Sequence, residues 1–217
     1  MKRIVIVGGH GKIALSLAEL LSGRGHHVHS LIRNSDQEAD ISATGAMPVL
    51  ADIEALSAEE LSEIFTGNDT IVFAAGAGGA SMERTYAVDR DAAIRTMDAA
   101  AHAGVDRYIM LSYKGASLDH GVPEDNDFFA YAESKAAADD HLRKGPLHYT
   151  IVGPGPLSSE RASGMIDVGD AATAEQASRD NVAQVLAEVI DSDNTIGHTI
   201  EFMDGSTPIA DAVAAIA

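Results

Sequence analysis

The chain has 217 residues, no cysteine and a formal net charge of −18. This length fits one α/β domain, and 46% of the residues are apolar, which suffices for a sizeable core. The missing thiols exclude disulfides, cysteine nucleophiles and thiolate metal sites, and the acidic balance argues against nucleic acid and anionic membranes as partners. No apolar run reaches the roughly 18 residues of a spanning helix and no signal-peptide pattern is present, so we expect a soluble cytoplasmic protein.

Apolar segments of strand length alternate with helical patterns along the chain. The expected strands cover residues 3–7, 27–32, 47–50, 70–75, 107–112, 147–152, 165–168 and 199–202. The expected helices cover residues 12–22, 57–65, 84–103, 128–143, 181–190 and 209–216. A capping box of Ser57 and Glu60 opens the second helix. Strands separated by helices pair in parallel through right-handed crossovers, so we expect a single Rossmann-like, doubly wound α/β sheet over residues 1–217.

One stretch, residues 153–180, is irregular and rich in Gly, Ser and Pro. It follows the carboxyl end of an expected strand, and ligands of open α/β sheets bind on that side of the sheet. We expect this stretch and the C-terminal end to form a small substrate-side portion. A plain surface connection is the alternative interpretation.

A glycine-rich turn joins the first expected strand to the first expected helix. Its residues are Gly8, Gly9, His10, Gly11, Lys12, Ile13 and Ala14. Gly8 permits a tight turn, Gly11 lets a pyrophosphate approach the backbone, and Ala14 is small enough for the helix to pack on the strand. The N–H groups that open such a helix point at a phosphate. We therefore predict a dinucleotide here, with His10 either contacting phosphate or filling the turn.

The second expected strand ends in Arg33, followed by Asn34 and Ser35. A protein that selects NAD usually places an acidic residue at this strand end, where it accepts from the ribose 2′-hydroxyl. A guanidinium instead pairs with a 2′-phosphate, and the two polar residues add donors. The sequence therefore predicts NADP(H) as the preferred cofactor, with NAD(H) as the alternative.

Two further strand ends supply candidate cofactor contacts. Asp52 and Ile53 follow the third strand, where a carboxylate accepts from an adenine amino group and an apolar side chain lies beside the ring. Ala74, Ala75 and Gly76 end the fourth strand, and small residues there allow a dinucleotide to pass close to the backbone.

Taken with these features, the chain resembles the short-chain dehydrogenase/reductase superfamily, and most of all its atypical branch of epimerase/dehydratase-like and NmrA-like proteins. The resemblance covers nearly the whole chain and rests on motifs in a characteristic order. Besides those above, they are Val88-Asp89, Leu111-Ser112, Tyr131-Ala-Glu-Ser-Lys135, Thr150-Ile-Val-Gly-Pro154-Gly155 and Phe202-Met-Asp-Gly205.

The resemblance implies a catalytic set of Ser112, Tyr131 and Lys135. In the family the Ser and Tyr hold the substrate oxygen, the Tyr acts as acid or base, and the Lys lowers the Tyr pKa and binds the nicotinamide ribose. Tyr131 and Lys135 are four residues apart and share one helical face. The family's usual Asn is replaced by Asp89, which puts the usual proton relay in question.

A second departure from the family pattern is Gly153, where related chains tend to carry Arg before the Pro-Gly pair. Pro154 still suits a sharp turn near the nicotinamide. Tyr113, beside the catalytic serine, is a rival for the active-site phenol. The histidines around the second strand lie on both of its faces with no carboxylate at ligand spacing, so no metal site is expected.

We therefore predict an NADP(H)-binding oxidoreductase or epimerase/dehydratase-like enzyme that exchanges hydride with a small carbonyl or alcohol. Two alternatives remain: a redox sensor or regulatory protein with little or no turnover, and a flavin or tetrapyrrole reductase on the same scaffold. A monomer is favoured over a homodimer built from the helices at 84–103 and 128–143.

Overall fold

A single central sheet organises the chain. The computed structural model describes residues 1–79, 81–169, 172 and 174–216. Within them a nine-stranded sheet has the order β11-β8-β10-β6-β5-β4-β1-β2-β3. Its mutually parallel strands are β1 (Arg3–Val7), β2 (His27–Ile32), β3 (Met47–Leu50), β4 (Thr70–Phe73), β5 (Arg107–Leu111), β6 (His148–Pro154) and β10 (His198–Asp204). This arrangement confirms the Rossmann-like, doubly wound fold.

The C-terminal edge of the sheet is antiparallel. β8 (Met165–Val168) pairs with β10, and β11 (Thr207–Pro208) pairs with β8. β7 (Leu157–Ser158) and β9 (Ala177–Ser178) form a separate parallel pair. The described part of the segment expected to be irregular therefore contributes three short strands. Only β8, with four residues, is long enough to be predicted from a pattern of alternating apolar and polar residues.

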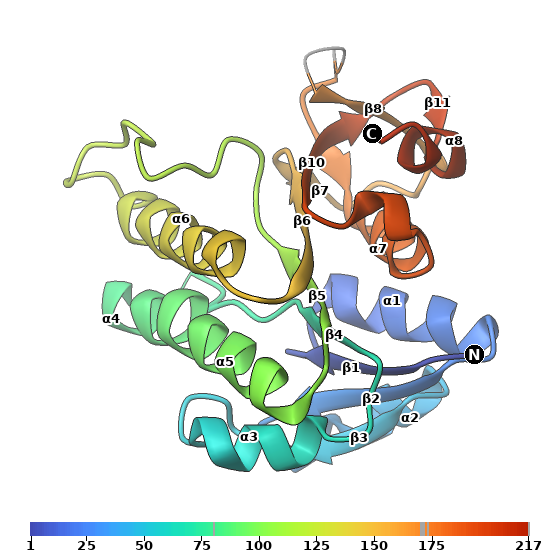
Figure 1. The fold of residues 1–217 in the computed structure, drawn as a ribbon. Coiled ribbons are helices and arrows are strands. Elements are labelled where there is room, and N and C mark those ends of the chain that lie inside the picture. Colours follow the sequence, from blue (N-terminus) through green and yellow to red (C-terminus); the bar gives the residue numbers. More distant parts are fainter. Residues whose placement is uncertain (80, 170–171, 173, 217) are drawn as a thin grey trace.

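Helices cover both faces of the sheet (Figure 1). One face carries α1 (Lys12–Gly23), α2 (Glu38–Ala43) and α7 (Arg179–Ile190), with α8 (Ile209–Ala214) packed on α7. The other face carries α3 (Ala58–Phe65), α5 (Ala93–Ala103) and α6 (Phe129–Lys144). Two short 3-10 turns are η1 (Ser35–Gln37) and η4 (Asp193–Thr195). No helix in the described ranges combines the length and apolarity needed to cross a membrane.

The central strand β1 shows why the sheet is covered on both sides. Ile4 and Ile6 join the core beneath α1 and α7, whereas Val5 and Val7 join the core beneath α3, α5 and α6. All four side chains are fully buried. Successive strand residues point to opposite faces, so a strand that is apolar throughout needs helices on both faces.

The helix expected over 84–103 is divided, which corrects the sequence prediction. α4 (Met82–Thr85) begins at Ser81, whose side chain accepts from the Arg84 N–H, and a π-helical segment, η2 (Tyr86–Ala92), separates α4 from α5. A π turn is wider than an α turn and occurs often at functional sites. In this chain the π turn covers Tyr86–Ala92, and the side chains of Val88 and Asp89 within it are buried. Residue patterns at a period of 3.6 do not reveal such a change of pitch.

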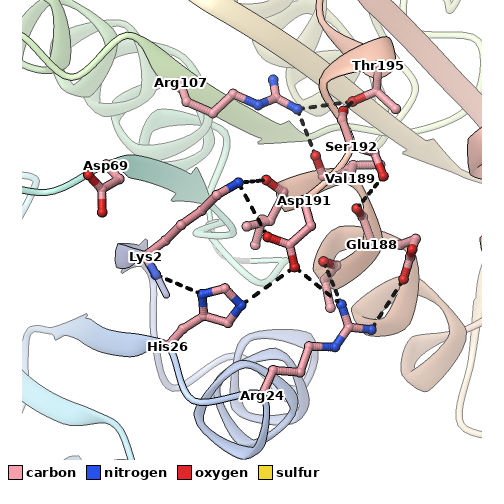
Figure 2. A network of polar contacts seen from close by, with 12 residues as sticks. Lys2, Arg24, His26, Asp69, Arg107, Glu188, Val189, Asp191, Ser192 and Thr195 are labelled. Atoms are coloured by element: carbon pink, nitrogen blue, oxygen red, sulfur yellow. Dashed lines mark hydrogen bonds and ion pairs between the residues drawn. The ribbon is translucent and has the colours of Figure 1, made fainter.

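Charged side chains tie the helix ends to the amino-terminal edge of the sheet (Figure 2). Asp191, at the end of α7, lies 3.3 Å from the Lys2 ammonium and 3.8 Å from the Arg24 guanidinium. Arg107, at the start of β5, donates to the Val189 carbonyl at 2.9 Å. Cations at helix C-termini satisfy the last carbonyls and the helix dipole. This network stabilises the edge opposite the carboxyl ends of the parallel strands.

Candidate functional site

A first cleft of about 280 Å³ lies at the carboxyl ends of β1, β2, β3 and β4. The strand order reverses between β1 and β4, which is the position where doubly wound sheets bind ligands. Nine residues predicted to bind a cofactor line it: Gly8, His10, Gly11, Arg33, Asp52, Ile53, Ala74, Ala75 and Gly76. The lining adds Leu31, Ile32, Gln37, Ala51, Glu54, Ala77, Arg84 and Val88, none of which was predicted to bind a cofactor, although Val88 belongs to a motif of the family resemblance.

The turn after β1 has the geometry that a dinucleotide needs. Gly8 has a φ of +82°, and a Cβ built there would lie 2.5 Å from the Cα of Ala75. Both the backbone conformation and the close approach of β4 therefore require glycine. Gly11 is the N-cap of α1 and makes no side-chain cap, and the first turn carries no acidic residue. The leading N–H groups of α1 thus remain free to bind a phosphate, so these residues fit a dinucleotide.

The other residues of the predicted cofactor set lie outside the lining of this cleft. They are Gly9, Lys12, Ile13, Asn34, Ser35, Ser112, Lys135 and Pro154. Gly9 packs against Ser30, since a Cβ there would lie 2.6 Å from the Ser30 Cβ. Asn34 accepts from the Asp36 N–H and caps η1. These two positions have structural roles that local sequence did not distinguish from binding roles, and their cofactor contacts stay predictions.

Two arginines stand on the rim of the first cleft and share one carboxylate. The Arg33 Nη1 lies 3.3 Å from the Glu54 Oε1, and the Arg84 Nη2 lies 3.1 Å from the same oxygen. The Glu54 N–H donates to the Asp52 Oδ1 at 3.0 Å, which closes a turn within this loop. His10 is held at 2.8 Å from the Asp40 Oδ2. The lining of this cleft therefore balances two guanidinium groups against two carboxylates, in a strongly acidic protein.

A second cleft of about 770 Å³ adjoins the first through Gly76 and Ala77. Its lining comes from the segment after β4, from α4 and η2, and from α6 and the approach to it. The residues are Gly76, Ala77, Gly78, Gly79, Met82, Thr85, Asp89, Glu124, Asp125, Asn126, Asp127, Phe128, Ala130 and Tyr131. This described lining contains four carboxylates and no Lys, Arg or His. The second cleft is therefore acidic, whereas in the first cleft two arginines balance two carboxylates.

Lys135 forms a buried pair with Asp89, which lines the second cleft. The Lys135 ammonium donates to the Leu111 carbonyl at 2.8 Å and lies 3.8 Å from the Asp89 Oδ1. The Asp89 Oδ2 accepts from the Ala77 N–H at 2.9 Å and so fixes the segment shared by the two clefts. Burial lowers the pKa of Lys135, and the carboxylates of Asp89 and Asp139 oppose that change. The position that replaces the family's Asn thus pairs with the lysine.

Ser112 is engaged by a residue that the sequence analysis missed. Its hydroxyl donates to the Asp139 Oδ2 at 2.6 Å, and both side chains are buried. Burial raises the pKa of Asp139, against the effects of the Ser112 hydrogen bond and of Lys135. Asp139 follows Lys135 by four residues, as Lys135 follows Tyr131, so all three share one face of α6. That repeat was the available signal.

Tyr131 is the member of the predicted catalytic set whose ring faces the second cleft, together with Asp89. Its ring lies 5.6 Å from that of Tyr113 and 5.3 Å from that of Phe128. Burial raises the pKa of Tyr131 well above its usual value, and the negative charges of Asp89 and Asp139 raise it further. Tyr131 is therefore a neutral phenol at pH 7 and a weaker acid than a free phenol, not a phenol with the lowered pKa that the family resemblance implies.

The rival phenol, Tyr113, is placed less favourably. Its hydroxyl is buried and has no hydrogen-bond partner among the described residues, and it lines neither cleft. Burial, and then the Asp139 carboxylate, raise the pKa of Tyr113. Gly153 lies behind it, since a Cβ at that glycine would lie 3.1 Å from the Tyr113 carbonyl oxygen. A larger residue at 153 would therefore press on β5's carboxyl end.

The stretch 153–180, expected to shape a substrate region, contributes no described residue to either cleft. Positions 170, 171 and 173 of that stretch lie outside the described residues. Residues 124–128, which lead into α6, line the second cleft, and the substrate role of 153–180 stays a prediction. In the described part of the chain, no group of three His, Asp or Glu side chains is arranged to hold a metal ion.

Comparisons with known proteins agree with this geometry. A family model described as NAD(P)H-binding matches residues 8–193. An uncharacterized sugar epimerase, YhfK, of Bacillus subtilis (strain 168) is 34% identical over 97% of this chain and 98% of its own. A solved structure of a putative NAD-dependent epimerase/dehydratase from Bacillus halodurans is 36% identical, with a TM-score of 0.89 over 98% of this chain and 99% of that chain.

A second solved structure, the oxidoreductase ylbE from Lactococcus lactis, is 29% identical, with a TM-score of 0.86 over 99% of this chain and 96% of that chain. The matched span includes the glycine turn, both clefts and the Tyr131–Lys135 helix. The resemblance read from the sequence is confirmed. The chain belongs to the NAD(P)H-binding family and is an atypical short-chain dehydrogenase/reductase-like protein.

Proposed function

We propose that this protein is an NADP(H)-dependent oxidoreductase that reduces a small carbonyl compound, with Tyr131 as the proton donor. One observation carries the proposal. The glycine-lined first cleft opens through Gly76 and Ala77 into a second cleft, and Tyr131 faces that second cleft with Lys135 behind it. A dinucleotide laid along the first cleft would bring its nicotinamide end to this junction.

In this proposal the first cleft binds the adenosine half of the cofactor. The N–H groups that open α1 bind the pyrophosphate, and Arg33 pairs with a 2′-phosphate. Asp52 uses its Oδ1 within its own turn, which leaves Oδ2 to accept from an adenine amino group. NADP(H) is accordingly preferred over NAD(H).

The second cleft carries out the proton chemistry while the bound cofactor supplies the hydride. Tyr131, held as a neutral phenol, donates its proton to the carbonyl oxygen as negative charge develops there. The Ser112 hydroxyl donates its hydrogen bond to Asp139, which leaves its oxygen lone pairs to accept from the hydroxyl group of the product. The Lys135 ammonium limits the negative charge left behind on the phenol.

The acidic lining of the second cleft restricts the substrate. Asp89, Glu124, Asp125 and Asp127 repel phosphate and carboxylate groups, and the described lining offers no cation to hold them. We therefore expect a neutral or cationic carbonyl compound rather than an anionic one.

The experiment begins with separate titrations of the protein with NADPH and NADH, followed by nicotinamide fluorescence. We expect tight binding of NADPH and weaker binding of NADH, and an Arg33→Ala variant should lose that difference. NADPH oxidation is then measured across a panel of carbonyl compounds. Tyr131→Phe should keep cofactor affinity and lose turnover, whereas Tyr113→Phe should keep both. An active Tyr131→Phe enzyme would refute the assigned role.

A second candidate function is a cofactor-binding sensor with little turnover. It is favoured by the burial of Ser112 and Lys135, neither of which lines the described clefts. A sensor binds NADPH but leaves every member of the carbonyl panel unreduced, and its affinity for a protein partner changes with the cofactor. The same panel therefore separates the two functions.

A further inference from the structure

The rim of the first cleft holds two arginines that come from distant parts of the chain. Arg33 follows β2, whereas Arg84 lies on α4, beyond β4. Both donate to the same oxygen, the Glu54 Oε1, at 3.3 Å and 3.1 Å, and the Arg84 Nε lies 3.4 Å from it as well. All three side chains line the first cleft. One anionic oxygen at this point thus receives donors from both guanidinium groups.

The loop that carries Glu54 is fixed from two sides. Its N–H donates to the Asp52 Oδ1 at 3.0 Å, and the preceding carbonyl, that of Ile53, accepts from the Arg95 Nη1 at 2.7 Å. The backbone therefore keeps the carboxylate at the rim. Its side chain is 27% exposed and free to turn, but it remains within reach of both arginines.

We propose that Arg84 is a second guanidinium for the 2′-phosphate of NADP(H), and that Glu54 competes with that phosphate for both arginines. The proposal rests on the function proposed above for the identity of the cofactor. Guanidinium groups bind phosphate through parallel, charge-assisted hydrogen bonds, and each arginine has five N–H donors. Glu54 takes donors from both and lowers the net charge of the trio to +1, so it limits the preference for NADP(H).

The physical consequence is a graded selectivity. Loss of Arg84 removes donors from the phosphate but leaves the adenosine and nicotinamide contacts, so NADPH affinity falls while NADH affinity stays. Loss of the Glu54 charge frees both arginines and removes a like charge beside the phosphate, so NADPH affinity rises. A residue that merely shaped the rim would move both affinities together.

The test compares the dissociation constants of NADPH and NADH for four proteins: wild type, Arg84→Gln, Glu54→Gln and Arg90→Gln. Arg90 is the matched control because it pairs with Asp91 at 2.7 Å and does not line the first cleft. We expect Arg84→Gln to weaken NADPH binding by about tenfold and Glu54→Gln to strengthen it by about threefold. Each variant should change the affinity for NADH by less than about twofold. Arg90→Gln should change neither.

The outcomes distinguish this inference from the proposed function. A wild-type protein that binds neither dinucleotide overturns both. A wild-type protein that prefers NADPH, together with an Arg84→Gln variant that loses NADPH and NADH equally or not at all, overturns only the role of Arg84. Weaker NADPH binding by Glu54→Gln overturns the competition, because Glu54 would then only orient the arginines.

Thermal unfolding of each variant establishes that it is folded. If Arg84→Gln does not fold, Arg84→Lys takes its place, because it keeps the charge but lacks the planar fork. We expect Arg84→Lys to weaken NADPH binding less than a substitution that removes the charge, and to leave NADH binding unchanged. Unchanged NADPH affinity in Arg84→Lys, at low and at high salt, would overturn the paired hydrogen bonds proposed for this arginine.

Discussion

The two clefts adjoin, yet they are built differently. The first is shaped mainly by backbone: a glycine turn, the open start of α1 and small residues at the end of β4. The second is lined by side chains from α4, η2, the approach to α6 and α6 itself, Asp89 among them, and Lys135 and Asp139 are buried behind it. Their charge also differs, because the first has two arginines beside its two carboxylates whereas the described lining of the second has four carboxylates and no cation. A fold can thus place two sites of different chemistry side by side.

Gly8→Ala should have the largest effect and would act on the first cleft alone. The new methyl group meets the Cα of Ala75 at 2.5 Å in a backbone conformation of positive φ. We expect loss of dinucleotide binding and a fall in the free energy of unfolding of about 3 kcal/mol. Urea unfolding and cofactor titration measure the two effects. Gly23→Ala is the control, because its Cβ has no neighbour within 4 Å and it should not destabilise the protein.

Asp89→Asn should act where the two clefts meet. The amide still accepts from the Ala77 N–H but no longer compensates the Lys135 ammonium, so the pKa of Lys135 should fall further. We expect a loss of about 2 kcal/mol at pH 7. When the pKa of a lysine is lower in the folded protein than in the unfolded chain, the buried charge destabilises the protein at pH values below the folded-state pKa. That destabilisation disappears as the pH rises to the usual pKa of lysine. The loss should therefore shrink at high pH, whereas exposed Asp91→Asn should show no such trend.

Asp139→Asn should change the pH dependence of stability on the side of the second cleft. Burial raises the pKa of Asp139 in the folded protein. The wild type therefore loses stability as pH rises from the usual carboxyl range through this raised pKa, because the carboxyl group must then ionise in a buried place. The variant, which cannot ionise, should gain stability relative to wild type over that range. Chemical unfolding at several pH values measures the difference, and an unchanged difference would contradict the prediction.

Asp191→Ala should have the smallest effect and should leave both clefts intact. It removes surface contacts to Lys2, His26 and Arg24 at the opposite edge of the sheet (Figure 2). Exposed ion pairs contribute about 0.5–1 kcal/mol and are screened by salt. We expect a loss of that size at low salt, less at high salt, and unchanged cofactor affinity. A change in affinity would show that this edge communicates with the first cleft.

Particular residues show how much of the structure could be predicted from the sequence. The capping box of Ser57 and Glu60 is present in the structure, as are the strand positions and the glycine turn. The helix of residues 38–43 escaped prediction because it is six residues long and buries only Ile41. Arg84 and Glu54 escaped because nothing local connects two charged, partly buried residues 30 positions apart.

The sequence by itself determined the order of strands and helices, the place of the dinucleotide turn and the family, because hydrophobic period, glycine spacing and strand-end chemistry are local properties. Only the tertiary structure decided that η2 turns Asp89 inward, that the Ser112 hydroxyl donates to Asp139 and that one carboxylate joins two arginines. Those arrangements arise when separate elements pack on a common sheet. Burial then lowers the pKa of Lys135 and raises those of Tyr131 and Asp139, and neither packing nor burial is encoded at any single position.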